Sequence, residues 1–478
     1  MTGVIRKEAA RLQEKDREMG RSSDREANRS RVNAGLKLDD TLTHKPITKN
    51  RMIPKKTRVS PDIIVVGGGA AGMMAAGRAA ERGAKVILVE KTHRLGNKLL
   101  LTGGGRCNIT HQADLREFIH AFGKNGRFLY RAFTAFSNRD LIHFFSSRGL
   151  DMRVDPDGKV FPADDRARSV LAVLRQYLDD NQVRILHRTV VTHMIFQPGE
   201  SLRAGGVRCG NDGVLNAGKV IVAAGGMSYP KTGSSGDGYK LARQCGHSIV
   251  PLTPGLVALE SDEPFLRELQ GITLKDISLS VFVDGRKKVS EKGDVLFTHF
   301  GVSGPTVLIL SGIVIDALAA GRSVALSLQL RPADTAQELD PILQREFESS
   351  GAKTLSRYLK QALPESLALL FERRCAIEPG KRCSRISREE RKRIALCFTD
   401  FRINIRKPRP IEEATITRGG VSLEEIHPRT MESRRVQGLF FCGEMMDVDG
   451  TTGGYNLQAA FSTGYLAGES AVEAEDKG

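Results

Sequence analysis

The stretch that decides the fold is residues 63–90, IIVVGGGAAGMMAAGRAAERGAKVILVE. It begins with an apolar, β-branched run at residues 63–66, which is typical of a buried parallel strand. A glycine turn and a helical pattern over about residues 70–82 follow, and a second apolar strand ends at Glu90. A carboxylate at that position can accept hydrogen bonds from both hydroxyls of a ribose. The order strand, turn, helix, strand and acid therefore predicts a βαβ unit that binds a dinucleotide.

The turn has the spacing G-x-G-x-x-G at Gly67, Gly69 and Gly72. Gly67 permits a tight turn, Gly69 lets the backbone approach a pyrophosphate, and Gly72 lets the helix pack close to the strand. The first-turn amides, near Ala70 and Ala71, then face the phosphates. Glycine turns of this kind also occur with nothing bound, so the prediction depends on the strand, helix and acid being in register.

A second cradle is indicated near the C-terminus. Residues 439–444 (LFFCGE) form a short buried strand that runs into a glycine and an acid, and residues 451–456 (TTGGYN) precede a small, apolar helical pattern over 457–467. A second helix N-terminus is thus offered to an anionic group, far from the first in sequence. Two such cradles suit FAD, with its adenine end on the first and its ribityl chain and isoalloxazine on the second.

Five segments carry a resemblance to a known family: VVGGGAAGMMAA (65–76), LLLTGGGRCNIT (99–110), VIVAAGGMSYPKTGSSGDGY (220–239), THFGVSGP (298–305) and the long block 417–468 that contains GGYNLQ. On these residues the chain resembles the BaiN-like family of FAD-dependent oxidoreductases, which includes a ribosomal-RNA dihydrouridine synthase branch. The resemblance spans residues 62–470. The chain departs from the family pattern at His111, where the glycine-arginine-cysteine motif usually ends in Asn.

The motifs and the resemblance together imply a set of cofactor-binding residues. These are Gly67, Gly69, Ala70, Ala71, Gly72, Glu90, Lys91, Lys98, Gly103, Gly104, Arg106, Asn108, Ala224, Gly225, Gly443, Glu444, Asp447, Gly453, Gly454, Asn456 and Leu457. Backbone donors around Gly453, Gly454 and Asn456 are expected to stabilise the negative charge that a flavin gains on its N1/O2 side when it is reduced. No metal site is predicted.

Four residues in the family segments are candidates for the chemistry at the flavin. Cys107 is either a general acid or a small buried thiol, and the buried thiol is the favoured interpretation. Arg106 either neutralises a substrate carbonyl or phosphate or pairs with a carboxylate of the fold. Tyr229 and His299 lie in loops that the fold can bring to the cleft, where either can donate a proton or serve as a structural hydrogen bonder.

Composition sets limits on the class of protein. The chain has 478 residues, enough for two or three domains, and 40% hydrophobic residues. Its seven cysteines include no C-x-x-C pair, which favours neither a disulfide framework nor a zinc site. No apolar run reaches about 18 residues, the length of a membrane span. We therefore expect a soluble, cytoplasmic protein without membrane contact, and no feature predicts its oligomeric state.

The first 61 residues differ from the rest. They hold 16 Lys and Arg and 8 Asp and Glu, a balance of +8, with few large apolar residues. This composition predicts a disordered basic tail. The alternative is that the natural protein begins at Met52, ten residues before the first strand.

A second basic stretch covers residues 371–410, which hold 13 basic and 5 acidic side chains. Such a segment can neutralise phosphates and would make binding salt-dependent. Together with the family resemblance, it predicts contact with ribosomal RNA here. The alternative is a solvated helical face, because few aromatic residues interrupt the charges.

The order of patterns predicts an α/β protein with a discontinuous Rossmann-like FAD-binding domain. Its first part is 62–255 and its second part is 409–478, with an inserted β-barrel-like portion at 256–332 and a helical basic portion at 333–408. Only one G-x-G-x-x-G is present, so NAD(P)H is expected to enter the substrate cleft transiently.

The expected activity is hydride transfer from NAD(P)H through FAD to an activated C=C bond, as the resemblance implies. The specific expectation is a uridine in ribosomal RNA, which gives dihydrouridine. Two alternatives remain open: reduction or dehydrogenation of small steroid-like enones, and an RNA-binding factor in which FAD is structural.

Overall fold

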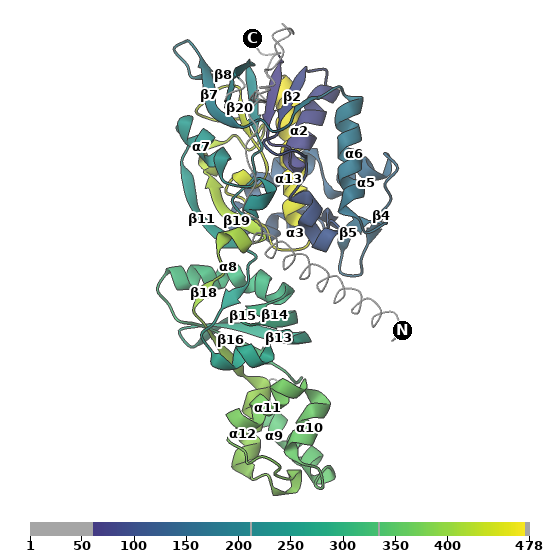
Figure 1. Cartoon of the computed structure of the whole chain (residues 1–478), viewed down its shortest axis with the longest axis vertical. Helices are drawn as coiled ribbons and strands as arrows, with labels where there is room; N and C mark the ends of the chain where they lie inside the picture. The colour runs from purple at the N-terminus through teal and green to yellow at the C-terminus, as the bar shows by residue number, and fades with distance from the viewer. Residues whose placement is uncertain (1–60, 211–212, 333–334, 474–478) are drawn as a thin grey trace, which may run out of the picture. The chain divides into compact units, whose positions relative to one another are not determined.

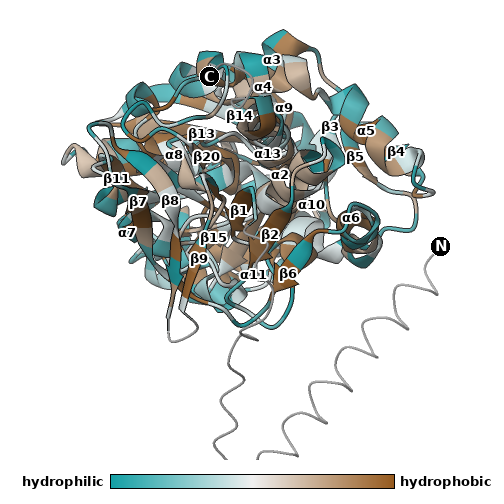
Figure 2. Cartoon of the chain, turned by 90° about the horizontal axis from the view of Figure 1, so that it is seen from above, coloured by the Kyte–Doolittle hydropathy of each residue, from teal (hydrophilic) through white to brown (hydrophobic). Residues whose placement is uncertain are grey.

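The computed structural model describes residues 61–210, 213–332 and 335–473, so the predicted tail lies outside the described residues except for Pro61. Its first domain is built on a five-stranded parallel sheet in the order β20-β10-β1-β2-β6. Figure 1 labels two of these strands, β20 and β2. The strands are Ile63–Val66 (β1), Val86–Val89 (β2), Arg184–Leu186 (β6), Lys219–Val222 (β10) and Leu439–Phe441 (β20). Strands β1 and β2 are buried along their whole length, which explains their continuous apolar sequence; Figure 2 shows both in brown.

Two helices from opposite ends of the chain pack together against this sheet. They are α2 (Ala70–Glu81) and α13 (Tyr455–Glu473). A Cβ at Gly464 or Gly468 of α13 would lie 2.3 or 2.4 Å from the carbonyl oxygens of Ala71 and Ala75 of α2. The two glycines, one turn apart, therefore allow the helix backbones to approach closely, and they bring both predicted cradles to one place.

Smaller elements complete this domain. One group contains the sheet β3-β5-β4 and four helices: β3 (Thr110–His111), α3 (Leu115–Ala121), α4 (Tyr130–Ala135), α5 (Asn138–Ser146), β4 (Met152–Val154), β5 (Lys159–Pro162) and α6 (Ala167–Asp180). A second group contains the antiparallel sheet β7-β8-β9 and one helix: β7 (Val191–Gln197), β8 (Arg203–Cys209), β9 (Gly213–Asn216) and α7 (Asp237–Gln244).

The insert contains a seven-stranded sheet in the order β17-β16-β13-β14-β15-β12-β18. Its strands are Leu259–Glu260 (β12), Thr273–Val283 (β13), Arg286–Thr298 (β14), Gly301–Ser303 (β15), Val324–Gln329 (β16), Phe401–Ile405 (β17) and Lys407–Pro408 (β18). Because only Arg406 separates β17 from β18, one chain segment borders both edges of the sheet. The predicted discontinuous Rossmann-like domain with a barrel-like and helical insert is thus confirmed.

The insert also contains a helix that the sequence patterns did not predict, α8 (Pro305–Ala319). Its sequence is largely apolar and rich in valine and isoleucine, so periodicity does not distinguish a buried helix from a strand. Gly304, with a φ of 100°, ends the preceding strand, and Pro305 at the first helical position starts the helix.

The helical portion consists of α9 (Ala336–Ser349), α10 (Leu355–Ala362), α11 (Glu365–Arg374) and α12 (Arg388–Thr399). It ends before residue 401, whereas the helical segment was predicted to extend to 408. The difference arises because Phe401, Ile403 and Ile405 alternate with exposed residues, so this stretch has the period of a strand. Residues of the helices, including Phe371 and Phe398, share one hydrophobic core with the inserted sheet.

The chain passes between the first domain and the insert through a two-stranded antiparallel ladder, β11 (Ile249–Gly255) with β19 (Ile416–Val421). Within the part of the chain that the structure describes, no helix combines the length and apolar character needed to cross a membrane.

Candidate functional site

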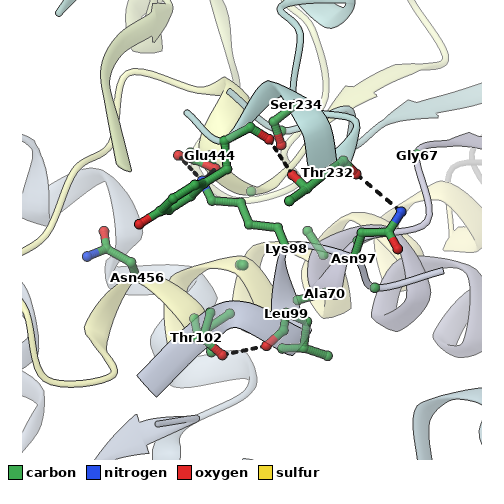
Figure 3. A pocket seen from close by; sticks show the side chains of 18 of the residues that line it. Gly67, Ala70, Asn97, Lys98, Leu99, Thr102, Thr232, Ser234, Glu444 and Asn456 are labelled. Atoms are coloured by element: carbon green, nitrogen blue, oxygen red, sulfur yellow. Dashed lines mark hydrogen bonds and ion pairs between the residues drawn. The ribbon is translucent and has the colours of Figure 1, made fainter. Parts of the chain in front are cut away.

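A cavity of about 560 Å³ opens where the parallel strands end. Its walls include Gly67, Glu90 and Ala223, which directly follow β1, β2 and β10, and Gly443, two residues after β20. Both ends of the fold contribute, as Gly67 and Glu444 show in Figure 3. The carboxyl edge of a parallel sheet is where α/β folds bind nucleotides. The volume lies within the range of small-molecule and cofactor sites.

Most of the predicted site residues meet in this cavity. Those that line it are Gly67, Gly69, Ala70, Ala71, Glu90, Lys91, Lys98, Gly103, Gly104, Arg106, Asn108, Ala224, Gly225, Tyr229, Gly443, Glu444, Gly453, Gly454, Asn456 and Leu457. Gly72, Cys107, Asp447 and His299 lie outside the lining.

The three glycines of the first turn occupy different environments. A Cβ at Gly72 would lie 1.8 Å from the carbonyl oxygen of Gly67, so this glycine serves helix packing and does not line the cavity. Gly67 has a φ of 105°, which other residues rarely adopt. Around Gly69 nothing lies within 4 Å of an added Cβ, and Gly69, as the N-cap of α2, has no side chain to bond the first-turn amides. Open space and uncapped amides at one point are what a pyrophosphate requires.

Glu90 lies directly after β2 and is nearly buried. One carboxylate oxygen accepts from the Gly68 N–H at 2.8 Å, and the other accepts from the Thr92 N–H at 2.7 Å. These bonds fix the carboxylate at the cavity wall, and each oxygen keeps lone pairs for a ribose hydroxyl.

An ion pair joins distant segments at the cavity wall. Lys98 Nζ donates to the two oxygens of Glu444 at 2.8 and 2.7 Å (Figure 3). It also donates to Ser228 Oγ at 2.6 Å. Glu444 also accepts from the Thr417 N–H of β19 at 2.9 Å. The carboxylate therefore ties the end of β20 to the linker strand and to the loop after β10, and its bonds orient Lys98 toward the cavity.

The loop before α13 is held by side chains from both parts of the domain. Asn456 Oδ1 accepts from the Gly450 N–H at 2.8 Å, so its amide organises the turn. The carbonyl of Gly453 contacts His111 Nδ1 at 3.1 Å, and with its amide oriented to match its neighbours, Asn108 accepts from the Gly454 N–H at 3.0 Å. His111, the departure from the family pattern, thus takes part in the positioning of this loop.

Arg106 and Cys107 follow the glycine turn as neighbours in sequence, but their side chains lie in different surroundings. The Cys107 thiol is fully buried, and burial raises its pKa to about 12. The Arg106 side chain is 48% exposed, lines the cavity and lies 4.3 Å from the ring centre of Phe161. Its nearest carboxylate, that of Asp165, is 4.0 Å away. The structure thus gives Cys107 the surroundings of a structural thiol and presents Arg106 to a ligand.

The remaining candidates occupy different places. Tyr229 lines the cavity in a left-handed conformation, with a φ of 52°. His299 is exposed in the turn between β14 and β15 and makes an edge contact with Phe300. Asp447 accepts, through its carbonyl oxygen, a bond of 2.7 Å from the Asn125 amide.

Several lining residues were not among those predicted, including Asp237, Lys159 and Phe161, whereas Lys91, which contacts Asp237, was predicted. Lys91 Nζ bonds the carboxylate of Asp237 at 2.6 Å, and hydrogen bonds from Lys91 and Ser235 lower the pKa of Asp237 to about 2, against the opposing effect of burial. Lys159 and Phe161 of β5 also line the cavity. The sequence segment SYPKTGSSGDGY indicated that the loop containing Ser235 and Asp237 contributes to the site. No local sequence signal indicated β5, because tertiary packing brings this strand to the cavity.

The basic segment 371–410 is largely neutralised within the fold. Eight of its 13 basic side chains form ion pairs: Arg373, Lys381, Arg391, Lys392, Arg402, Arg406, Lys407 and Arg409. Arg382, Arg385 and Arg388 are exposed and have no ion pair among the described residues. Contact of this segment with RNA stays a prediction, and these three arginines are its most available groups.

The residues present fit FAD. The α2 cradle with its open space at Gly69 suits the pyrophosphate, Glu90 suits the adenosine ribose, and the glycine loop before α13 supplies backbone donors at the far end of the same cavity.

Comparison with known proteins places these features in a family. The profile of the HI0933-like protein Rossmann domain matches residues 61–470. The chain is 30% identical over 412 residues to a 3-dehydro-bile acid delta(4,6)-reductase of Clostridium scindens, covering 86% of this chain and 98% of that protein. It is also 30% identical over 416 residues to the ribosomal RNA dihydrouridine synthase of Escherichia coli, covering 87% and 98%. The enzyme of that name from Haemophilus influenzae is 30% identical over 406 residues, covering 84% and 96%.

Proposed function

The chain belongs to the HI0933-like family of FAD-dependent oxidoreductases, and we propose that it passes hydride from NAD(P)H to the C5=C6 bond of a uridine in ribosomal RNA, giving dihydrouridine. The relatives at 30% identity carry two names, a bile-acid reductase and a dihydrouridine synthase. Both names describe the reduction of a carbon–carbon double bond, so the reaction class is better supported than the substrate.

FAD, when bound, supplies a group that accepts hydride from a nicotinamide and gives it to a substrate carbon. The protein binds and orients the reactants. The amides of the first turn of α2 and the open space at Gly69 hold the pyrophosphate, and Glu90 holds the ribose. With one G-x-G-x-x-G in the sequence, NAD(P)H uses the same cleft as the substrate and leaves before the substrate enters.

The observation that carries the choice of RNA is the pair Arg106 and Phe161 at the cavity wall. A half-exposed guanidinium stacked on an aromatic ring offers both a charge for a phosphate and a surface for a base. A uridine withdrawn from its stack into this cavity costs a few kcal/mol, which phosphate contacts at Arg106 and at Arg382, Arg385 and Arg388 help to offset.

The carbon next to the hydride acceptor must also gain a proton. Of the four predicted catalytic residues, Arg106 and Tyr229 line the cavity, and Tyr229 carries the O–H. We assign the proton transfer to Tyr229. Tyr229→Phe is then expected to slow reduction of the substrate while leaving FAD binding unchanged.

A second candidate is reduction of a small polycyclic enone. The apolar side chains of the wall favour it, including Leu101, which is 52% exposed, and Val190 and Ile416. A third is an RNA-binding factor in which FAD has no redox role.

The test uses the FAD-loaded protein with NADH or NADPH and two substrates: ribosomal RNA that lacks dihydrouridine, and a conjugated steroid ketone. We expect dihydrouridine to form, at a rate that falls steeply with salt and is lowered more by Arg106→Gln than by the control Arg94→Gln, another lining arginine. Salt-insensitive reduction of the steroid alone would select the enone function. Failure of both nicotinamides to reduce the flavin would select the structural role.

A further inference from the structure

Two cysteines in the helical part of the insert lie in direct contact. Cys375 caps the C-terminus of α11, and Cys397 lies in α12. Their sulfur atoms are 3.3 Å apart. Cys375 is buried, whereas Cys397 is partly exposed.

The neighbouring contacts hold the two thiols in place. The rings of Phe371 and Phe398 pack 5.0 Å apart, and each lies within one turn of a cysteine. Arg393 Nε donates to the carbonyl oxygen of Cys375 at 2.7 Å, which fastens α12 to the end of α11. The helices therefore present the sulfurs to each other as part of a packed core.

The contacts around the pair favour the thiolate form at Cys397, against the opposing effect of burial. The thiol of Cys375 donates to Cys397 Sγ, and this hydrogen bond, aided by the Arg374 guanidinium, lowers the pKa of Cys397. Burial instead raises the pKa of Cys107, Cys245 and Cys442. A partly exposed thiolate reacts with oxidants, whereas a buried neutral thiol does not.

We propose that Cys375 and Cys397 are an oxidation site, at which a hydroperoxide converts the two thiols into a disulfide between α11 and α12. The Cys397 sulfur attacks a peroxide oxygen, the O–O bond breaks, and a sulfenic acid and water form. The Cys375 sulfur then attacks the sulfenic sulfur, the S–O bond breaks, and the thiol proton leaves with a second water. Two thiols and hydrogen peroxide thus give one disulfide and two waters.

The pair is suited to resolve such a sulfenic acid because the sulfurs need to approach only from 3.3 Å to about 2.0 Å. The bond would cross-link two helices of the basic segment, between the last turn of α11, with Arg373 and Arg374, and the face of α12 that carries Arg393. Neither cysteine lines the cavity, so the modification is independent of the proposed reaction.

The test treats the reduced, FAD-loaded protein with hydrogen peroxide, blocks free thiols with N-ethylmaleimide under denaturing conditions, and maps the peptides by mass spectrometry. We expect a Cys375–Cys397 linked peptide, the loss of two N-ethylmaleimide labels, and recovery of both labels with dithiothreitol. Peroxide that leaves both residues labelled, or oxidises the buried cysteines first, would overturn the proposal.

Two variants and a control make the test specific. Cys375→Ser should leave a sulfenic acid on Cys397 that dimedone traps, and Cys397→Ser should leave Cys375 unreacted. Cys383→Ser, which removes another buried cysteine of the same segment, should still form the link. FAD content and Tm report whether each variant folds. A Cys375 that reacts equally in the Cys397→Ser protein would contradict the assigned order.

Discussion

Replacing each of two glycines of the first turn by alanine separates cofactor binding from folding. At Gly69, an added methyl meets no atom within 4 Å, and the backbone, with a φ of −81° and a ψ of −172°, accepts any residue. We expect Gly69→Ala to change the free energy of unfolding of the FAD-free protein by no more than about 0.5 kcal/mol. The methyl instead occupies the space that the pyrophosphate needs.

The magnitude follows from the bonds that are lost. Displacing the phosphate from one charge-assisted N–H bond costs about 1.5–3 kcal/mol. At about 1.4 kcal/mol for each factor of ten, the Kd for FAD should rise about 10- to 150-fold.

Gly72→Ala is the matched control, and its main expected effect is a loss of stability in the FAD-free protein. Its methyl would lie 1.8 Å from the Gly67 carbonyl oxygen, and backbone cannot move aside as a side chain can. Overpacking costs about 3 kcal/mol at the upper end of its usual range. The gain of alanine over glycine within a helix returns about 1 kcal/mol. We expect a net loss of about 2 kcal/mol in the FAD-free protein.

The assays are denaturant unfolding of the FAD-free proteins and titration of FAD fluorescence. A Gly69→Ala protein that binds FAD with unchanged Kd would refute the assignment of the open space to the pyrophosphate. So would a loss of FAD-free stability as large as that of Gly72→Ala.

Three further predictions concern ion pairs near the cavity. The hydrogen bond from Lys91 is the main cause that lowers the pKa of Asp237 to about 2 in the folded protein. The Asp237 carboxylate therefore stabilises the fold fully above its ordinary pKa near 3.8, and this stabilisation is lost as the pH falls toward 2. Asp237→Asn should flatten the dependence of Tm on pH in that window. Glu444→Gln removes the charge that Lys98 faces and should lower the free energy of unfolding by about 2 kcal/mol in urea titrations. Arg418→Ala breaks the bonds from the linker strand to Asp316 and Asp449, so it should raise the rate of proteolytic cleavage in the linkers, whereas Arg418→Lys should have a smaller effect.

Much of the site was predictable because its local patterns carry physical requirements. The G-x-G-x-x-G turn, Glu90 and the glycine loop before α13 each serve a geometry that few other residues satisfy. All of them except Gly72, which serves helix packing, contribute to the cavity wall. Local sequence patterns did not show which distant residues the fold brings to the cavity. His299 lies in a motif of the resemblance yet ends in an exposed turn, and Phe161 reaches the cavity through packing that no short pattern announces.

The number of charged residues in a segment likewise does not predict the free charge at its surface. The 371–410 segment has a strong basic excess, but partners outside the segment, such as Asp340, Glu260 and Asp262, neutralise many of its side chains. Those partners lie far away in sequence, so the free charge at the surface is known only once the fold is. The same holds for α8, whose largely apolar sequence fits a strand as well as a helix.

The most direct test of RNA reduction is mass spectrometry of ribosomal RNA nucleosides from cells with and without this gene, scored for dihydrouridine. We predict that the modified nucleoside is lost on deletion and is restored by the wild-type protein, but not by Gly69→Trp, whose side chain fills the cradle. An unchanged level of dihydrouridine in the deletion strain would contradict the proposal and point to small-molecule redox chemistry.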